Sequence, residues 1–120
     1  MGESGNRRIL ITGALGQIGM ELLDALQSKF GKDNVIASDI RESDDVDTSK
    51  FRYEKLDVLN SEQMENIIRD NEINEVYHLA AILSATGEKN PELCWKINMD
   101  GLMNVLELAR KYKFRIFSPS

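Results

Sequence analysis

Residues 8–19 read RILITGALGQIG, and this stretch decides the fold. Its first five residues include adjacent apolar and β-branched side chains, which is typical of a strand buried on both faces of a parallel sheet. Three glycines follow at intervals of three residues, and an apolar pattern of helical spacing begins at the second one. Backbone N–H groups come closest to a phosphate where such a turn carries no side chain. The stretch therefore predicts a strand, a tight turn and a helix start that together bind an anion.

The composition indicates one globular domain with a single modest core. The chain has 120 residues, of which 42% are hydrophobic and 29% charged. Its net charge of −5 argues against a nucleic-acid partner, because nucleic-acid recognition usually needs a basic face. No apolar run approaches the roughly 18 residues of a membrane span, so no membrane partner is expected. The single cysteine, Cys94, favours a reducing compartment, which is the cytoplasm, or the mitochondrial matrix in a eukaryote.

Strand-like and helix-like patterns alternate along the chain. Strands are predicted at residues 8–12, 35–39, 51–56, 75–81 and 115–118. Helices are predicted at residues 16–29, after the capping pattern of Asn60 and Gln63, and after Asn90, which precedes a proline. This alternation predicts a Rossmann-type α/β fold, a doubly wound parallel sheet of about five strands with helices on both faces, truncated at strand five. Ligands of such sheets bind beyond the carboxyl ends of the strands, where strand order reverses.

Helical spacing also predicts which side chains reach the core. In the first helix, an apolar face of Ile18, Leu22, Leu23 and Leu26 is expected, with Gly31 as the C-terminal cap. In the later helices the residues expected to pack are Met64, Ile67, Ile68, Leu93, Cys94, Trp95, Ile97, Val105 and Leu108. A glycine at position 101 costs the last helix about 1 kcal/mol relative to alanine, so it indicates close approach to the sheet.

The three glycines have separable roles in a dinucleotide site. Gly13 permits the sharp turn, Gly16 lets a pyrophosphate approach the backbone, and Gly19 lets the helix lie close to the sheet. The spacing G-x-x-G-x-x-G differs from the standard G-x-G-x-x-G, so the prediction depends on its position between a strand and an amphipathic helix. A plain strand–helix turn with structural glycines is the alternative.

An acid at the end of the second strand predicts the cofactor. Asp39 lies about 20 residues after Gly19, where a carboxylate accepts hydrogen bonds from the adenosine ribose. Such a carboxylate repels the 2′-phosphate of NADP, and neither Ala14 nor Leu15 supplies a compensating cation, although Arg41 is near. The predicted cofactor is therefore NAD. The alternative is an aspartate that caps a loop.

Two further strand ends carry candidate contacts. Asp57 and Val58 follow the third strand, where a carboxylate and an apolar wall would bracket an adenine, or where Asp57 only caps a turn. Leu79, Ala80 and Ala81 end the fourth strand in mostly small side chains that leave room for a cofactor.

Three other polar features carry weaker functional signals. His78 is interpreted as a packed strand histidine rather than a base. Asn98 has poor helix propensity, so its amide either ties the helix to a strand backbone or faces water. With one histidine and one cysteine, the sequence predicts no metal site.

These features together resemble the extended short-chain dehydrogenase/reductase family. The resemblance rests on TGALGQIG at residues 12–19, SDIR at 38–41, DV at 57–58 and Asn98. Within the family it is closest to the L-threonine 3-dehydrogenase branch, whose most distinctive stretch is similar to HLAAILSATGEKNP at residues 78–91.

The resemblance implies an NAD-dependent oxidoreductase that converts L-threonine to 2-amino-3-ketobutyrate, as a homodimer in its full-length form. The cofactor contacts expected from the patterns and the resemblance are Gly13, Gly16, Gln17, Ile18, Gly19, Asp39, Ile40, Arg41, Asp57, Val58, Leu79, Ala80, Ala81 and Asn98. Ser84 is the one substrate-side residue expected, unless it is a loop serine that faces water.

The chain departs from the family pattern in its catalytic residues. The family uses a tyrosine followed four residues later by a lysine, but Tyr53, Tyr77 and Tyr112 lack that lysine. The expected domain division is therefore a disordered N-terminus at residues 1–7 and an NAD-binding domain at residues 8–120, the N-terminal portion of a longer enzyme. No catalytic residue is expected within the chain, which is predicted to be inactive alone.

Two other functions fit the same residues. One is a nucleotide-sugar epimerase or dehydratase of the extended family. The other is a non-catalytic NAD-sensing domain, which the missing tyrosine–lysine pair would equally suit.

Overall fold

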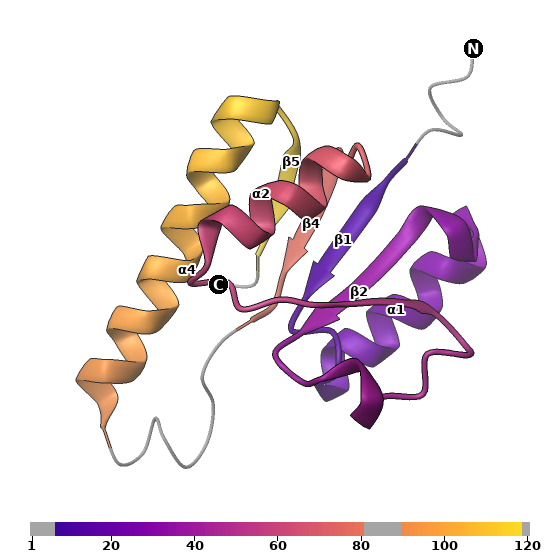
Figure 1. Ribbon diagram of the computed structural model, residues 1–120, viewed down its shortest axis with the longest axis horizontal. Helices are drawn as coiled ribbons and strands as arrows, with labels where there is room; N and C mark the ends of the chain where they lie inside the picture. The colour runs from indigo at the N-terminus through magenta and orange to yellow at the C-terminus, as the bar shows by residue number, and fades with distance from the viewer. Residues whose placement is uncertain (1–6, 81–89, 119–120) are drawn as a thin grey trace.

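The computed structural model describes residues 7–80 and 90–118. Its centre is a five-stranded sheet in the order β3-β2-β1-β4-β5 (Figure 1). The strands are β1 (Ile9–Thr12), β2 (Val35–Asp39), β3 (Arg52–Lys55), β4 (Glu75–His78) and β5 (Arg115–Phe117). Every pairing is parallel. Strand order reverses at β1, which confirms the predicted doubly wound Rossmann-type sheet.

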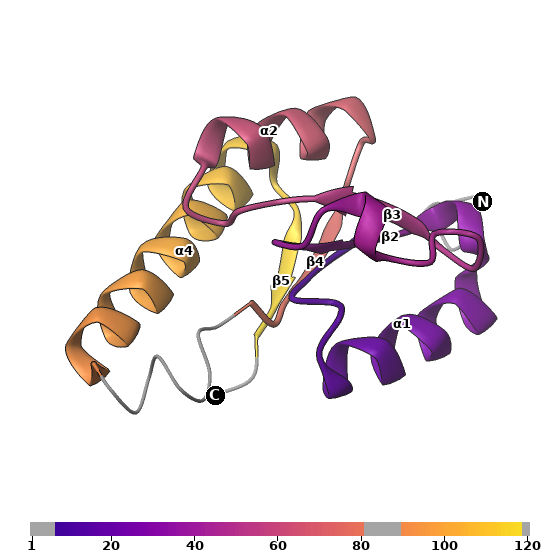
Figure 2. The ribbon, with the colours of Figure 1, turned by 60° about the horizontal axis from the view of Figure 1, so that its bottom comes forward.

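Helices lie on both faces of this sheet (Figure 2). One face carries α1 (Gln17–Phe30), and the opposite face carries α2 (Ser61–Asp70) and α4 (Pro91–Tyr112). Short 3-10 turns, η2 (Lys32–Asn34) and η3 (Ser43–Asp45), follow α1 and β2. Because β2 and β3 are joined without an α-helix, the chain after β2 remains a loop beside the carboxyl end of that strand.

The first strand is the centre of the core. Ile9, Leu10 and Ile11 are fully buried, because one helical layer covers each face of β1. Leu10 belongs to the cluster formed with α2 and α4, whereas Ile9 and Ile11 belong to the cluster formed with α1. Adjacent apolar residues in β1 thus have partners on both faces, as the sequence predicted.

The ends of the helices follow the predicted signals. The Asn60 side chain accepts a hydrogen bond from Gln63 N at 3.0 Å, and the Asn90 side chain accepts one from Leu93 N at 3.1 Å. Gly31 ends α1 with a φ of +95°, a conformation that favours glycine. The predicted N-terminal caps of α2 and α4 and the C-terminal cap of α1 are confirmed.

Three predicted core positions were wrong. Ile18 is 69% exposed, because α1 contacts the glycine turn through the buried Gly19, and the neighbouring Ile18 points outward. Leu93 and Trp95 are also exposed, Trp95 by 68%. The N-terminal part of α4 extends past the sheet (Figure 1), and the first buried residue of that helix is Gly101.

Strand β4 ends earlier than predicted, at His78 rather than residue 81. Leu79 N still bonds to Thr12 O at 3.1 Å, but the pairing in register with β1 stops at His78. Among the helices that the structure describes, none is both long and apolar enough to cross a membrane.

Candidate cofactor-binding site

The turn after β1 requires glycine at its first position. Gly13 has a φ of +68°, and a Cβ there would lie 2.7 Å from Ala80 N. Both the backbone conformation and the contact with the end of β4 therefore exclude a side chain. The turn packs directly on the backbone that follows β4.

The other two glycines differ from each other in what surrounds them. A Cβ at Gly19 would lie 2.6 Å from Gly13 O, so the packing of α1 on the turn requires glycine. A Cβ at Gly16 would meet only Gly13 O, at 3.7 Å. Since packing within the protein does not require glycine at position 16, the space beside it is open.

The start of α1 leaves its first N–H groups without a side-chain cap. Gly16 is the N-cap and provides no side-chain acceptor, and the first turn contains no acidic residue. Gln17 and Ile18 are both exposed there. Uncapped N–H groups at a helix N-terminus favour an anion, so the open space beside Gly16 suits a phosphate.

The end of β2 is bonded to the same turn. Asp39 Oδ2 accepts a hydrogen bond from Leu15 N at 3.1 Å, and Asp39 Oδ1 accepts one from Ile40 N at 2.7 Å. One residue earlier in the turn and in β2, Ala14 N donates to Ser38 O at 2.9 Å. The carboxylate of Asp39 therefore lies at the glycine turn. The two hydrogen bonds that hold it there are those of a loop-capping aspartate, the alternative interpretation.

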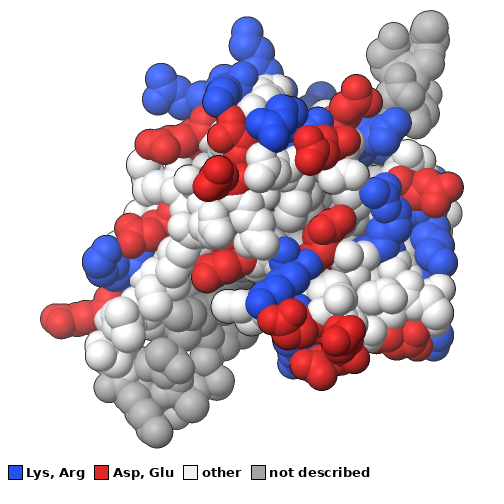
Figure 3. All heavy atoms as spheres, in the orientation of Figure 1, with Lys and Arg blue, Asp and Glu red and all other residues white. Residues whose placement is uncertain are grey.

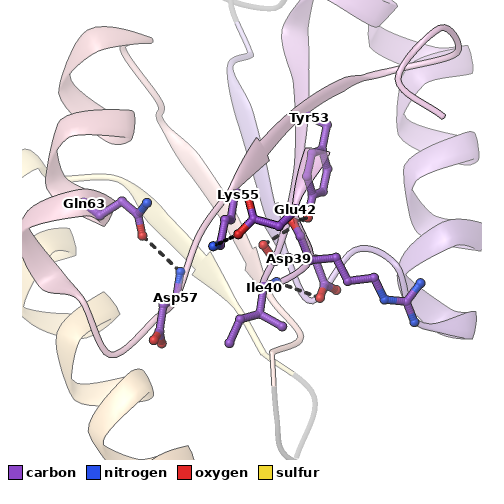
Figure 4. Close-up of polar contacts among 8 residues, drawn as sticks. Asp39, Ile40, Glu42, Tyr53, Lys55, Asp57 and Gln63 are labelled. Carbon is purple, nitrogen blue, oxygen red and sulfur yellow. Dashed lines mark hydrogen bonds and ion pairs between the residues drawn. The ribbon is translucent and has the colours of Figure 1, made fainter. Parts of the chain in front are cut away.

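The turn after β3 is held by polar contacts, of which the one between Asp57 and Gln63 is drawn in Figure 4. Asp57 N donates to Gln63 Oε1 at 3.1 Å, and Asp57 Oδ1 accepts from Leu59 N at 3.0 Å. Gln63 therefore supports Asp57 rather than the Asn60 N–H that a standard capping box would satisfy. One oxygen of the Asp57 carboxylate caps its own turn, which supports the turn interpretation for that oxygen.

Helix α4 packs closely on Val58. A Cβ at Gly101 would lie 2.8 Å from Val58 Cγ2, so the helix is closely packed at this glycine, but against the loop after β3 rather than against the sheet as predicted. Asn104 Nδ2 donates to Val58 O at 2.9 Å. This tie was not predicted; the sequence indicated one from Asn98 instead, whose Nδ2 lies 3.5 Å from Cys94 Sγ.

Thr12 connects the ends of β1 and β4. Its Oγ1 accepts hydrogen bonds from Leu79 N at 3.1 Å and Ala80 N at 3.2 Å, and lies 2.9 Å from His78 Nδ1. Because Oγ1 already accepts two bonds, its own proton goes to Nδ1, which requires a neutral His78 with the proton on Nε2. Thr12 was not predicted as a site residue, and its position directly before Gly13 is the sequence signal that could have found it.

His78 is a packed histidine, as predicted. The residue is only 5% exposed. Burial lowers the pKa of the imidazole below its ordinary value, which keeps the ring neutral. The neutral ring is the form that accepts the Thr12 proton.

The structure thus brings most predicted contacts to one edge of the sheet. Asp39 is the last residue of β2, and the glycine turn, Asp57 and Ala80 follow the carboxyl ends of the neighbouring parallel strands, with Ile40 and Arg41 exposed beside them. Ala81 and Ser84 lie outside the described residues. Among residues 7–80 and 90–118, no group of three or more potential metal ligands is close enough to hold an ion. On the face shown in Figure 3, Lys and Arg side chains are interspersed with Asp and Glu.

A parallel sheet of this order, with a glycine turn where the order reverses, defines a Rossmann-type dinucleotide-binding domain. The profile of the NAD-dependent epimerase/dehydratase family matches residues 9–120, and the chain belongs to this family. The predicted resemblance to extended short-chain dehydrogenases is confirmed, as is NAD as the cofactor of the family.

Known relatives agree with this assignment. An uncharacterized epimerase/dehydratase of Staphylococcus aureus (strain USA300) is 50% identical over 115 residues, which are 95% of this chain and 36% of the relative. A monomeric L-threonine 3-dehydrogenase from a metagenome, in its apo form, is 54% identical with a TM-score of 0.85, over 93% of this chain and 35% of that one. A holo L-threonine dehydrogenase from Cupriavidus necator is 44% identical with a TM-score of 0.87, over 94% and 36%. The chain spans about a third of the length of these relatives.

Proposed function

We propose that residues 8–120 are the NAD-binding domain of an oxidoreductase that converts L-threonine to 2-amino-3-ketobutyrate. Membership of the family supports a dinucleotide-dependent enzyme. The names of the structural neighbours, L-threonine dehydrogenases at 54% and 44% identity, support the substrate. The observation that carries the proposal is the contact of the Asp39 carboxylate with the glycine turn.

The described residues fit such a cofactor. The diphosphate would take the open space beside Gly16 and the uncapped N–H groups of Gln17 and Ile18, with Gly13 and Gly19 keeping the turn close to the sheet. When bound, the nicotinamide supplies a hydride acceptor. The remaining proposed contacts are Asp39 on the ribose, Ile40, Arg41, Asp57 and Val58 around the adenine side, and Leu79, Ala80, Ala81 and Asn98 toward the nicotinamide side. Ser84 is proposed on the substrate side.

The chain itself lacks the residues expected to remove the substrate proton. No tyrosine in the sequence is followed four residues later by lysine. We therefore propose that the chain binds NAD without oxidising threonine. The test is a calorimetric titration of the chain with NAD and NADP, alongside an assay for threonine-dependent NADH formation. Binding of NAD with no turnover is expected. Equal affinity for NADP, or absence of NAD binding, would contradict the proposal.

A nucleotide-sugar epimerase or dehydratase is the second candidate. The Staphylococcus aureus relative, at 50% identity, carries an epimerase/dehydratase name. A full-length protein that contains this segment, assayed with L-threonine and with a nucleotide sugar, separates the two candidates. NADH formation with threonine supports the first, and interconversion of the nucleotide sugar without net NADH supports the second.

The homodimer and the cytoplasmic or mitochondrial location of the whole protein stay predictions. The homodimer is a proposal from family resemblance, and one solved relative is described as monomeric. Light scattering of the full-length protein would give its mass in solution. A mass of one chain would contradict the dimer.

A further inference from the structure

The Tyr53 hydroxyl contacts the loop that follows β2 (Figure 4). Tyr53 lies on β3, its ring packs against the α1 cluster, and it meets Phe51 edge-on at 6.5 Å between ring centroids. Its hydroxyl lies 2.6 Å from Arg41 O and 3.1 Å from Asp39 O. A side chain from β3 therefore reaches the backbone of residues 39–42, here called the acidic corner.

One phenol proton serves these two carbonyls. Asp39 O also accepts a hydrogen bond from Leu56 N at 2.8 Å, so it has a partner within the sheet. The shorter contact, to Arg41 O, is therefore the one to which Tyr53 donates. Burial, and next the charge of the Asp39 carboxylate, raise the pKa of Tyr53 to about 12, so the hydroxyl remains a donor at neutral pH.

A second contact ties the acidic corner to β3. Lys55 forms an ion pair with Glu42 (Figure 4), but the two side chains are 43% and 65% exposed. Exposed ion pairs contribute little, because water and salt screen them. Tyr53, an intermediate residue in burial, is the side chain that bonds directly to Arg41, whereas the ion pair holds Glu42.

The position of Arg41 matters because Asp39, two residues earlier in the chain, is the proposed contact of the ribose. Asp39 uses its two carboxylate oxygens to accept from Leu15 N and Ile40 N, so its orientation depends on where the backbone of residue 40 runs. The hydrogen bond from Tyr53 fixes the carbonyl of Arg41, the residue that follows Ile40. With that carbonyl released, the exposed guanidinium of Arg41 is free to approach a 2′-phosphate.

We propose that Tyr53 is a positioning residue for the adenosine half of the dinucleotide, which holds the acidic corner so that the site takes NAD and disfavours NADP. This inference rests on the proposed function and adds a residue outside the glycine turn and its acidic partner. Tyr53 itself touches no cofactor. It acts through the backbone of Arg41.

The test compares Tyr53→Phe with a matched control, Tyr112→Phe. Both changes remove one hydroxyl, and the Tyr112 hydroxyl bonds to Glu65 at 2.6 Å, between α4 and α2 rather than at the acidic corner. Dissociation constants for NAD, NADP, AMP and nicotinamide mononucleotide are measured by calorimetry on the whole chain, with a thermal melt of each variant.

Tyr53→Phe is expected to weaken NAD and AMP binding about two- to tenfold, the range for one lost hydrogen bond. NADP binding is expected to be unchanged or tighter, so the preference for NAD over NADP falls, while the affinity for nicotinamide mononucleotide stays constant. Tyr112→Phe should change the melt without changing this preference.

Two results would overturn the inference. One is an unchanged preference for NAD over NADP in Tyr53→Phe, and the other is equal loss for all four ligands, as a merely structural role would give. Either result, with normal NAD binding by the wild type, leaves the proposed function in place. A wild type that binds no NAD refutes the proposed function and this inference together.

Discussion

Asp39 Oδ2 accepts a hydrogen bond from Leu15 N at 3.1 Å, which joins the end of β2 to the glycine turn after β1. The residue expected to hold the ribose and the turn expected to hold the diphosphate are therefore parts of one hydrogen-bonded unit. The same bond makes the capping and ribose-binding interpretations of Asp39 compatible, because a carboxylate has lone pairs beyond those used here.

Replacing Asp39 by Asn removes the negative charge. The single amide oxygen keeps one of the two hydrogen bonds that the carboxylate accepts from Leu15 N and Ile40 N, because the NH2 group cannot accept the other. We expect NADP to gain at least about fivefold relative to NAD, since like charges at about 4 Å repel by about 1–4 kcal/mol. Calorimetric titration with both cofactors checks this. Asp24→Asn, an equal change of charge on the exposed side of α1, is the control and should leave the ratio unaltered.

Alanine at Gly13 should mainly lower stability, whereas alanine at Gly16 should mainly weaken NAD binding. Gly13→Ala combines a φ of +68° with a contact of 2.7 Å to Ala80 N, so it should destabilise the fold by about 2 kcal/mol or more. Gly16→Ala should change stability by no more than about 1 kcal/mol, as expected at an N-cap. It should weaken NAD about tenfold or more, because the Cβ enters the space left for the diphosphate. Denaturant unfolding and NAD titration measure the two effects. Full NAD affinity in Gly16→Ala would refute the diphosphate position.

Thr12 gives a prediction about the end of β4. Thr12→Val removes the side-chain acceptor of Ala80 N and the donor to His78 Nδ1, whereas Leu79 N retains Thr12 O. Unsatisfied buried polar groups cost about 1–3 kcal/mol, so unfolding free energy should fall by that amount. Thr12→Ser, which keeps the hydroxyl, should restore most of it. Equal losses in the two variants would show that the methyl group, not the hydroxyl, matters.

The pH dependence of stability should report His78. Burial lowers its pKa in the folded state below the ordinary value of 6.5, so below that pH the unfolded chain binds more protons. The stabilisation is therefore complete above about pH 7 and is lost as pH falls through about 6.5 toward the folded pKa. His78 is the single histidine in the sequence. Urea unfolding between pH 8 and 5 should show this slope in the wild type and not in His78→Phe. An identical slope in both would assign it to other groups.

Local patterns were sufficient for much of the fold. The buried β1 and β2 were predictable because both faces of a central parallel strand demand apolar residues, and α4 begins where Asn90 and a proline signal it. The glycine turn and Asp39 were predictable for another reason. Their spacing along the chain is fixed by one strand–helix–strand unit.

Long-range contacts could not be read from these patterns. Thr12 bonds to residues more than 60 positions away, and Asn104 reaches Val58 across 46 positions. The sequence around Tyr53 indicates only a strand, and nothing in it predicts that the hydroxyl bonds to the loop after β2. Exposure of Ile18 and Trp95 depends on where each helix extends past the sheet, which periodicity does not specify.

The most direct test is a titration of ¹⁵N-labelled chain with NAD, followed by the shifts of its backbone amide signals. We expect the largest changes at Leu15, Gly16, Gln17, Ile40 and Ala80, at the carboxyl edge of the sheet, and expect NADP to produce them only at higher concentration. Changes confined to the outer side of α4, or none at millimolar NAD, would contradict this expectation.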